Sequence, residues 1–88
     1  MSDEPVRRQV TLANPNGLHL SPIIALVKEA MNHEAELLIC FDGNIANARS
    51  TMELMLLGAT CGAVLSVEAS GNGAEAAADA AVRLLSEP

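Results

Sequence analysis

The sequence has almost no aromatic residues: Phe41 is its single Phe, and it has no Trp or Tyr. Single-stranded nucleic acids are commonly held by stacking bases on aromatic side chains, so this mode of binding is excluded. Positive charge is also scarce, with 5 Lys and Arg against 11 Asp and Glu and a net charge of −6. Because phosphate backbones and anionic membranes bind clustered Lys and Arg, we expect neither nucleic acid nor a membrane surface as partner.

Long apolar runs are missing as well, and no stretch approaches the roughly 20 apolar residues of a membrane helix. The first ten residues, MSDEPVRRQV, are polar and lack the apolar core of a signal peptide. The two cysteines, Cys40 and Cys61, have the spacing of neither a metal site nor a disulfide framework. No P-loop or dinucleotide-binding glycine pattern occurs. We therefore expect a cytoplasmic protein with reduced thiols, no metal and no cofactor.

What the sequence does contain is apolar aliphatic residues in regular patterns. Half of its 88 residues are apolar, which suits one folded domain over residues 1–88, with residues 1–5 as a frayed tail. Alternating residues predict strands at Val6–Leu12, Glu36–Phe41, Asn44–Ala48 and Ala63–Ala69. Helical spacing predicts a first helix with Pro22 in its first turn and its end at Asn32 and His33, a short second helix between Ser50 and Gly58, and a third from Ala74 to about Ser86.

This element order, β-α-β-β-α-β-α, predicts the fold class. Asp42-Gly43 is a strong signal for a two-residue hairpin turn. Ser50 and Glu53 have the spacing of a capping box at the start of the second helix. A central hairpin with helices between the outer strands indicates an α+β fold, with one mixed or antiparallel sheet and helices on one face.

His19 is the residue best placed for chemistry. It stands in the segment Asn16–Pro22, sequence NGLHLSP, at the start of the first helix. A helix start offers unpaired N–H groups and the positive end of the helix dipole, which together form an anion site. Because neutral imidazole is a good nucleophile near pH 7, a ring nitrogen facing those amides could accept a phosphoryl group. The alternative is a solvated histidine that begins a helix by chance.

The Asn16–Pro22 segment resembles the active-site stretch of the HPr family of phosphocarriers of the bacterial phosphotransferase system. The likeness continues through Asn47-Ala48-Arg49-Ser50 and Leu57-Gly58 and spans about residues 6–86. It implies an HPr-like open-faced β-sandwich, with a four-stranded antiparallel sheet and three helices on one face. It also implies that His19 becomes a phosphohistidine, charged by a phosphoenolpyruvate-dependent enzyme I and discharged to a IIA-type partner of a sugar or nitrogen system. Such a protein is a stoichiometric carrier rather than an enzyme.

The resemblance assigns the phosphate-binding role to Gly17, Leu20 and Ser21. At the position of Ser21, two residues after the histidine, members of the family usually have Arg. A guanidinium would give the phosphoryl oxygens charge-assisted hydrogen bonds of about 1.5–3 kcal/mol, whereas Ser21 offers one neutral hydroxyl. We therefore expect phosphorylated His19 to be less favoured by about one to two decades.

The partner-docking surface expected around His19 is apolar rather than basic. Lys28 is the only basic residue on its first-helix part, and Glu53 adds a negative charge on the second helix. Methionine side chains adapt to several partners, which suits a surface of this kind. The residues assigned to it are Ile24, Lys28, Thr51, Met52 and Met55.

Two roles fit Ser50. As the N-cap of the second helix it would contribute about 1 kcal/mol. In some members of the HPr family the matching serine is phosphorylated by a dedicated kinase, so an HPr kinase/phosphorylase is a possible regulatory partner. A second hypothesis for the whole chain follows: a regulatory interaction domain on the HPr fold, controlled at Ser50, that binds partners without efficient phosphotransfer.

The sheet face opposite the core is expected to carry an apolar patch. Leu38, Cys40, Ile45 and Val64 alternate with the core-facing residues of their strands. Exposed apolar patches often mark interfaces, so this pattern predicts a weak homodimer.

Overall fold

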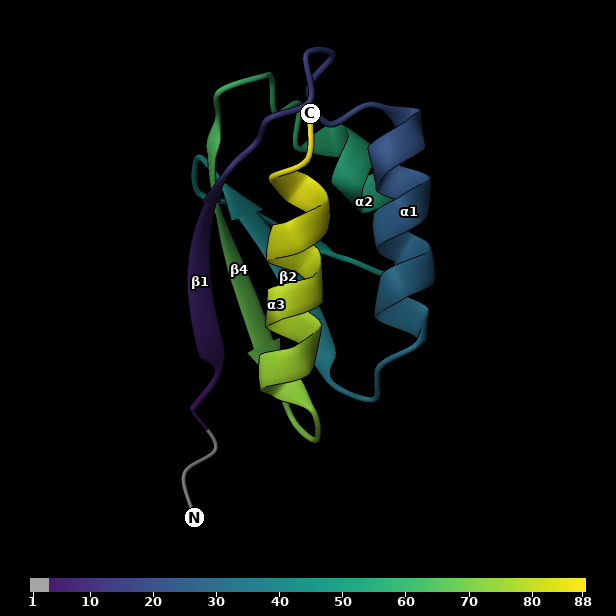
Figure 1. The fold of residues 1–88 in the computed structure, drawn as a ribbon, viewed down its shortest axis with the longest axis vertical. Coiled ribbons are helices and arrows are strands. Elements are labelled where there is room, and N and C mark those ends of the chain that lie inside the picture. The colour runs from purple at the N-terminus through teal and green to yellow at the C-terminus, as the bar shows by residue number, and fades with distance from the viewer. Residues whose placement is uncertain (1–3) are drawn as a thin grey trace.

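The computed structural model describes residues 4–88 and has the predicted element order (Figure 1). Each boundary lies within one or two residues of its expected place. The strands are β1 (Val6–Thr11), β2 (Glu36–Phe41), β3 (Asn44–Asn47) and β4 (Val64–Ser70), and the helices are α1 (Leu20–Met31), α2 (Thr51–Leu56) and α3 (Ala74–Leu85). The expected tail falls partly outside the described residues, since residues 1–3 are not described and β1 begins directly after Pro5.

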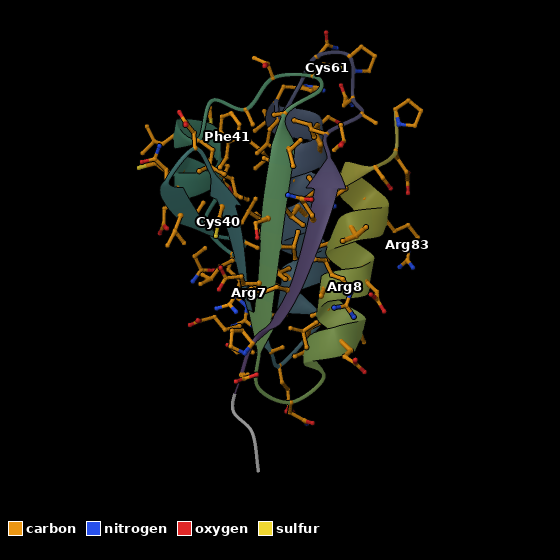
Figure 2. The ribbon with its side chains drawn as sticks, turned by 90° about the vertical axis from the view of Figure 1, so that its left-hand side faces the viewer. Arg7, Arg8, Cys40, Phe41, Cys61 and Arg83 are labelled. Atoms are coloured by element: carbon orange, nitrogen blue, oxygen red, sulfur yellow. The ribbon has the colours of Figure 1, made fainter. Side chains whose placement is uncertain are left out.

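The four strands form one antiparallel sheet in the order β1-β4-β2-β3. The chain therefore places its last strand between the first and the second, which closes the N- and C-terminal halves onto each other. All three helices cover one face of the sheet, and the other face is open (Figures 1 and 2). The predicted α+β architecture is confirmed, and of the two sheet types left open by the sequence the antiparallel one is correct.

The core lies between the sheet and the helices. Its strand residues alternate as predicted, with Leu37, Ile39, Leu65 and Val67 all buried. α3 turns alanines toward the sheet, and small side chains let this helix approach closely. Val27 and Val82 pack against the core at its rim and are only half-buried. In the described residues no helix is long and apolar enough to cross a bilayer.

The β2–β3 hairpin has the turn that Asp42-Gly43 predicts. The φ angles are 51° at Asp42 and 80° at Gly43, and a two-residue turn of type I′ needs positive φ at both positions. Asp tolerates the left-handed region better than most residues, and Gly has no Cβ to oppose it. The turn fixes the register in which Phe41 pairs with Asn44.

The open sheet face is less apolar than the alternation alone indicates. Ile45 and Val64 are 63% and 52% exposed, and Leu38 and Cys40 are half-buried. Strand register places Glu68 beside Leu38 and Ser66 beside Cys40. An ion pair of Arg7 with Glu68, 3.7 Å from Nε to Oε1, crosses the same face. Ile45, Leu38 and Cys40 therefore form an apolar patch on the β2–β3 side, and Val64 is a separate exposed apolar residue at the start of β4. Cys40 and Arg7 are both seen on this face in Figure 2.

Candidate functional site

His19 is the N-cap residue of α1. Its backbone is extended, with φ −95° and ψ −175°, and its carbonyl accepts the amide of Ile23 at 3.1 Å. Its half-buried side chain makes no capping hydrogen bond. Within the described part of the chain the amides of Leu20 and Ser21 have no hydrogen-bond acceptor, and Pro22 has no N–H. The first turn of α1 therefore presents two unpaired donors next to the imidazole, where an anion is favoured.

The loop before His19 is fixed by hydrogen bonds within the loop and by one to the segment after α2. The side-chain oxygen of Asn14 accepts a hydrogen bond from the backbone N–H of Asn16 at 2.9 Å. The backbone carbonyl of Asn14 accepts a second one from the backbone N–H of Gly17, also at 2.9 Å. The Leu18 amide then donates to the carbonyl of Ala59 at 2.9 Å. The histidine thus follows a turn that is hydrogen-bonded to a segment forty residues further along the chain, at the end of the molecule where the chain also ends (Figure 1).

Gly17 allows this contact between the two segments. Its φ is +68°, and a Cβ built on it would lie 2.7 Å from the Ala59 carbonyl oxygen and 2.9 Å from Thr60 Cα. Any side chain would both strain the backbone and force the loops apart. The positive φ and the close approach together explain why glycine stands two residues before the histidine.

Ser21 is exposed and lines a shallow cavity of about 140 Å³. The other polar residues on its wall are Asn14, across the start of α1, and Glu87, which follows α3. No Lys or Arg lines this cavity. The cavity wall beside Ser21 therefore offers neutral side-chain donors, and its charged side chain, Glu87, is acidic.

An apolar surface covers the outer side of α1 and α2, as the sequence predicts for Ile24, Met52 and Met55. These side chains are exposed, whereas Leu54 and Leu57 are buried. Thr51, Met52, Met55 and Leu56 line a shallow groove of about 580 Å³. Sequence reasoning missed Leu56, which is 78% exposed. Helical spacing distinguishes the buried Leu54 and Leu57 from the exposed Met55, but Leu56 is apolar within an entirely apolar run and carries no polar signal that marks it as exposed.

Lys28, assigned to the docking surface expected around His19, lies at the opposite end of α1 from His19. It is in the last turn of α1, about 12 Å along the helix axis from Leu20 at the usual rise per residue. Arg49 is engaged at the same end of α1, where its guanidinium donates to the carbonyls of Ala30 at 3.4 Å and His33 at 2.5 Å. Neither cation is placed to compensate a charge on the His19 ring.

Ser50 caps α2 as predicted, but the capping box is only half formed. The Ser50 hydroxyl accepts the amide of Glu53 at 3.2 Å. The Glu53 carboxylate accepts the Asn47 amide at 3.0 Å, whereas the Ser50 amide donates to the Asn47 carbonyl at 2.9 Å. The reciprocal bond is displaced because a tight turn at Asn47–Ser50 already satisfies the Ser50 amide.

The two cysteines differ in environment. Burial raises the pKa of the Cys40 thiol, and the neighbouring carboxylate of Glu68 raises this pKa further, so Cys40 is a poor nucleophile at neutral pH. Cys61 is exposed on the segment that holds the His19 loop, with its Sγ 3.9 Å from the Ala13 carbonyl. In residues 4–88 no three His, Cys, Asp or Glu side chains are grouped closely enough to hold a metal ion.

Comparison with known proteins adds independent evidence. The family model described as "PTS HPr component phosphorylation site" matches residues 6–87. The chain is 34% identical over 80 residues to the phosphocarrier protein HPr of Vibrio cholerae, covering 91% of this chain and 94% of that protein. Its fold is similar to a phosphocarrier protein HPr from Bacillus anthracis, with a TM-score of 0.88, 31% identity and coverage of 92% and 96%. It is also similar to an HPr dimer from Thermoanaerobacter tengcongensis, with a TM-score of 0.71, 32% identity and coverage of 85% and 86%.

Proposed function

The chain belongs to the HPr family of the phosphotransferase system, and on that basis we propose that His19 carries a phosphoryl group from an enzyme I-type donor to a IIA-type acceptor. Members of this family are phosphoryl carriers that are consumed and regenerated, not turnover enzymes. The observation that carries the assignment is the pair of unpaired amides, of Leu20 and Ser21, beside an uncommitted imidazole. Incubation with phosphoenolpyruvate and a purified enzyme I, followed by intact-mass measurement, tests it.

The site contains the nucleophile and the neutral hydrogen-bond donors that the transfer step needs. The lone pair of a neutral ring nitrogen of His19 forms a bond to phosphorus while the bond from phosphorus to the donor breaks, and that electron pair leaves with the donor. The phosphoryl oxygens then lie against the amides of the first turn of α1 and the Ser21 hydroxyl. Transfer of this kind depends mainly on positioning and charge stabilisation. The tied loop at Gly17 and Leu18 supplies the positioning.

The partners are proposed to dock on the apolar surface of α1 and α2, around Ile24, Thr51, Met52 and Met55. Ser50 lies at the start of α2, next to this surface. A phosphate on Ser50 would add about 1.5 to 2 negative charges there, so an HPr kinase/phosphorylase acting at Ser50 would weaken docking. Lys28 lies on the same helix as Ile24 and serves as the one basic docking residue of α1.

Substituting Ser21→Arg is expected to lengthen the hydrolysis half-life of phosphorylated His19 by about ten- to a hundredfold. A guanidinium at this position would give paired, charged donors to the phosphoryl oxygens in place of one rotatable hydroxyl, and one to two decades correspond to about 1.4–2.7 kcal/mol. The measurement is the decay of the phosphorylated protein at neutral pH, followed by intact mass. Ser21→Gln, long and polar but neutral, is the matched control and should leave the half-life within about twofold. Equal decay of the Arg variant and the parent would mean that the helix amides already suffice.

We further propose weak self-association through the β2–β3 side of the open sheet face. Support comes from the exposed Ile45 next to the half-buried Leu38 and Cys40 and from the relative that was solved as a dimer. Sedimentation of the parent at high micromolar concentration is expected to show a dimer fraction that Leu38→Lys removes, because a buried unpaired ammonium opposes the contact. Gln9→Lys, an exposed change on the polar β1 side of the same face, is the control. A monomer at all concentrations would contradict this proposal.

A further inference from the structure

Two segments that meet at His19 contain no charged side chain. Residues 9–27 and 54–67 lack Asp, Glu, Lys and Arg altogether, so all 5 basic and 11 acidic residues lie elsewhere. The segments are bound to one another in space: besides the bond from Leu18 to Ala59, the amide of Gly62 donates to the carbonyl of Leu12 at 2.8 Å. The end of the molecule that would carry a phosphoryl group is therefore formed largely by an uncharged surface.

Each basic residue of the chain is placed away from His19 or is engaged with another group. Arg7 pairs with Glu68 on the open sheet face, and Arg8 pairs with Asp79 at 3.5 Å between β1 and α3. Arg83 points outward from α3, away from the rest of the molecule (Figure 2). Lys28 and Arg49 lie at the far end of α1, as described above. None of the Lys and Arg side chains, all of which lie in residues 4–88, is therefore available to a phosphoryl group on His19.

One acidic residue near this end, Glu87, makes the shortage of positive charge more severe. Glu87 shares a cavity with Ser21, and the chain as a whole has a net charge of −6. A phosphoryl group adds about 1.5 to 2 further negative charges. Backbone amides and a hydroxyl stabilise such a group only partly, because hydrogen bonds from ionised donors are about twice as strong as those from neutral ones.

We propose that the donor that charges His19 supplies the missing cation in trans, from a Lys or Arg beside an apolar docking face. This inference rests on the proposed carrier function and specifies the partner's chemistry. The apolar part of that face would pack on Leu20, Ile24 and Leu56, which are all exposed. Its rim at the His19 end would be basic rather than acidic, because Lys28 lies at the far end of α1 and an acidic rim beside His19 would meet no Lys or Arg. Such a rim would also be repelled by Glu87 and by the net charge.

The test compares two donors. One is a purified enzyme I whose docking rim is acidic, and the other is the same enzyme with those rim carboxylates replaced by Lys; phosphorylation of each by phosphoenolpyruvate shows that it is intact. The parent chain is expected to be charged at least about tenfold faster by the basic-rimmed donor, since tenfold corresponds to only about 1.4 kcal/mol. Ser21→Arg should reduce the ratio of the two charging rates, because an Arg in the chain itself makes a cation from the donor redundant. Ser21→Gln, which adds no charge, should leave this ratio unchanged.

The outcomes separate this inference from the carrier function. If both donors charge the parent equally fast, or the acidic-rimmed donor charges it faster, the proposal that the partner supplies a cation is wrong. The carrier function of His19 would still stand. If neither donor charges the chain, phosphoramidate serves as a small-molecule donor that needs no docking face. Failure of His19 to be labelled by phosphoramidate as well would overturn both proposals. Labelling by phosphoramidate alone would show that a basic rim is not enough for docking, and would overturn the partner assignment.

Discussion

Replacing His19 with Gln is expected to abolish phosphorylation of the chain by phosphoenolpyruvate and enzyme I while leaving the fold intact. Gln keeps hydrogen-bonding capacity but has no nucleophilic nitrogen, so the loss should be complete. The His19 side chain makes no capping hydrogen bond and is only partly buried, so the free energy of unfolding should change by no more than about 0.5 kcal/mol. Intact-mass measurement after incubation and a urea unfolding curve give the two quantities.

The second histidine supplies the matched control. The His33 ring lies 2.9 Å from the Glu29 carboxylate at the far end of α1, away from the unpaired amides at Leu20 and Ser21. His33→Gln should therefore be phosphorylated like the parent. Because the P–N bond of a phosphohistidine is labile in acid and stable in base, the label should be lost at low pH. Label that survives acid, or that persists in His19→Gln, would place the modification on another residue.

Much of this fold could be predicted from local patterns, because each element carries its own signal. The alternation from Glu36 to Phe41, the turn at Asp42-Gly43 and the cap at Ser50 act over two to six residues and are all observed. The strand order β1-β4-β2-β3 could not be read in this way. It depends on contacts between Val6–Thr11 and Val64–Ser70, which are far apart in the sequence and leave no periodic signal.

In the candidate site, too, some features could be predicted from the sequence and others could not. The helix start at His19 and the outward face with Ile24 and Met55 follow from helical spacing, so sequence alone places them. The separation of Lys28 from His19 was missed although helical rise gives it, since Lys28 lies about 12 Å along α1 from Leu20. The partner of the Glu53 carboxylate was also missed, because its choice between two nearby amides is decided by the fold of the Asn47–Ser50 turn.

The contact beneath Gly17 likewise leaves no signal in the sequence. Glycine in Asn14–Gly17 indicates a turn, but only the structure shows that the Ala59 carbonyl lies where a Cβ would be. This contact ties the loop before His19 to the segment after α2, and with it the position of the imidazole. Gly17 performs no chemistry itself, but the position of the reacting imidazole depends on it.

Gly17→Ala is expected to lower the free energy of unfolding by about 3 kcal/mol or more, and phosphorylation of His19 by about a hundredfold. A left-handed φ costs an L-residue roughly 1–2 kcal/mol, and the remainder comes from the new Cβ, which would lie 2.7 Å from a backbone oxygen that cannot move alone. The two loops must separate, breaking or lengthening the bond from Leu18 to Ala59. A shift of about 1 Å at a reacting group can cost a hundredfold in rate.

Gly58→Ala measures the backbone part of this effect by itself, so that the difference between the two variants gives the steric part. Gly58 has a φ of +63°, close to the +68° of Gly17, but a Cβ on it would have no neighbour within 4 Å. Its alanine variant should therefore show the backbone cost alone, about 1–2 kcal/mol, and should be phosphorylated nearly as fast as the parent. Urea unfolding and the initial rate of labelling by enzyme I are compared for the two variants. Equal losses at both positions would mean that the φ angle, and not the contact with Ala59, makes glycine necessary before His19.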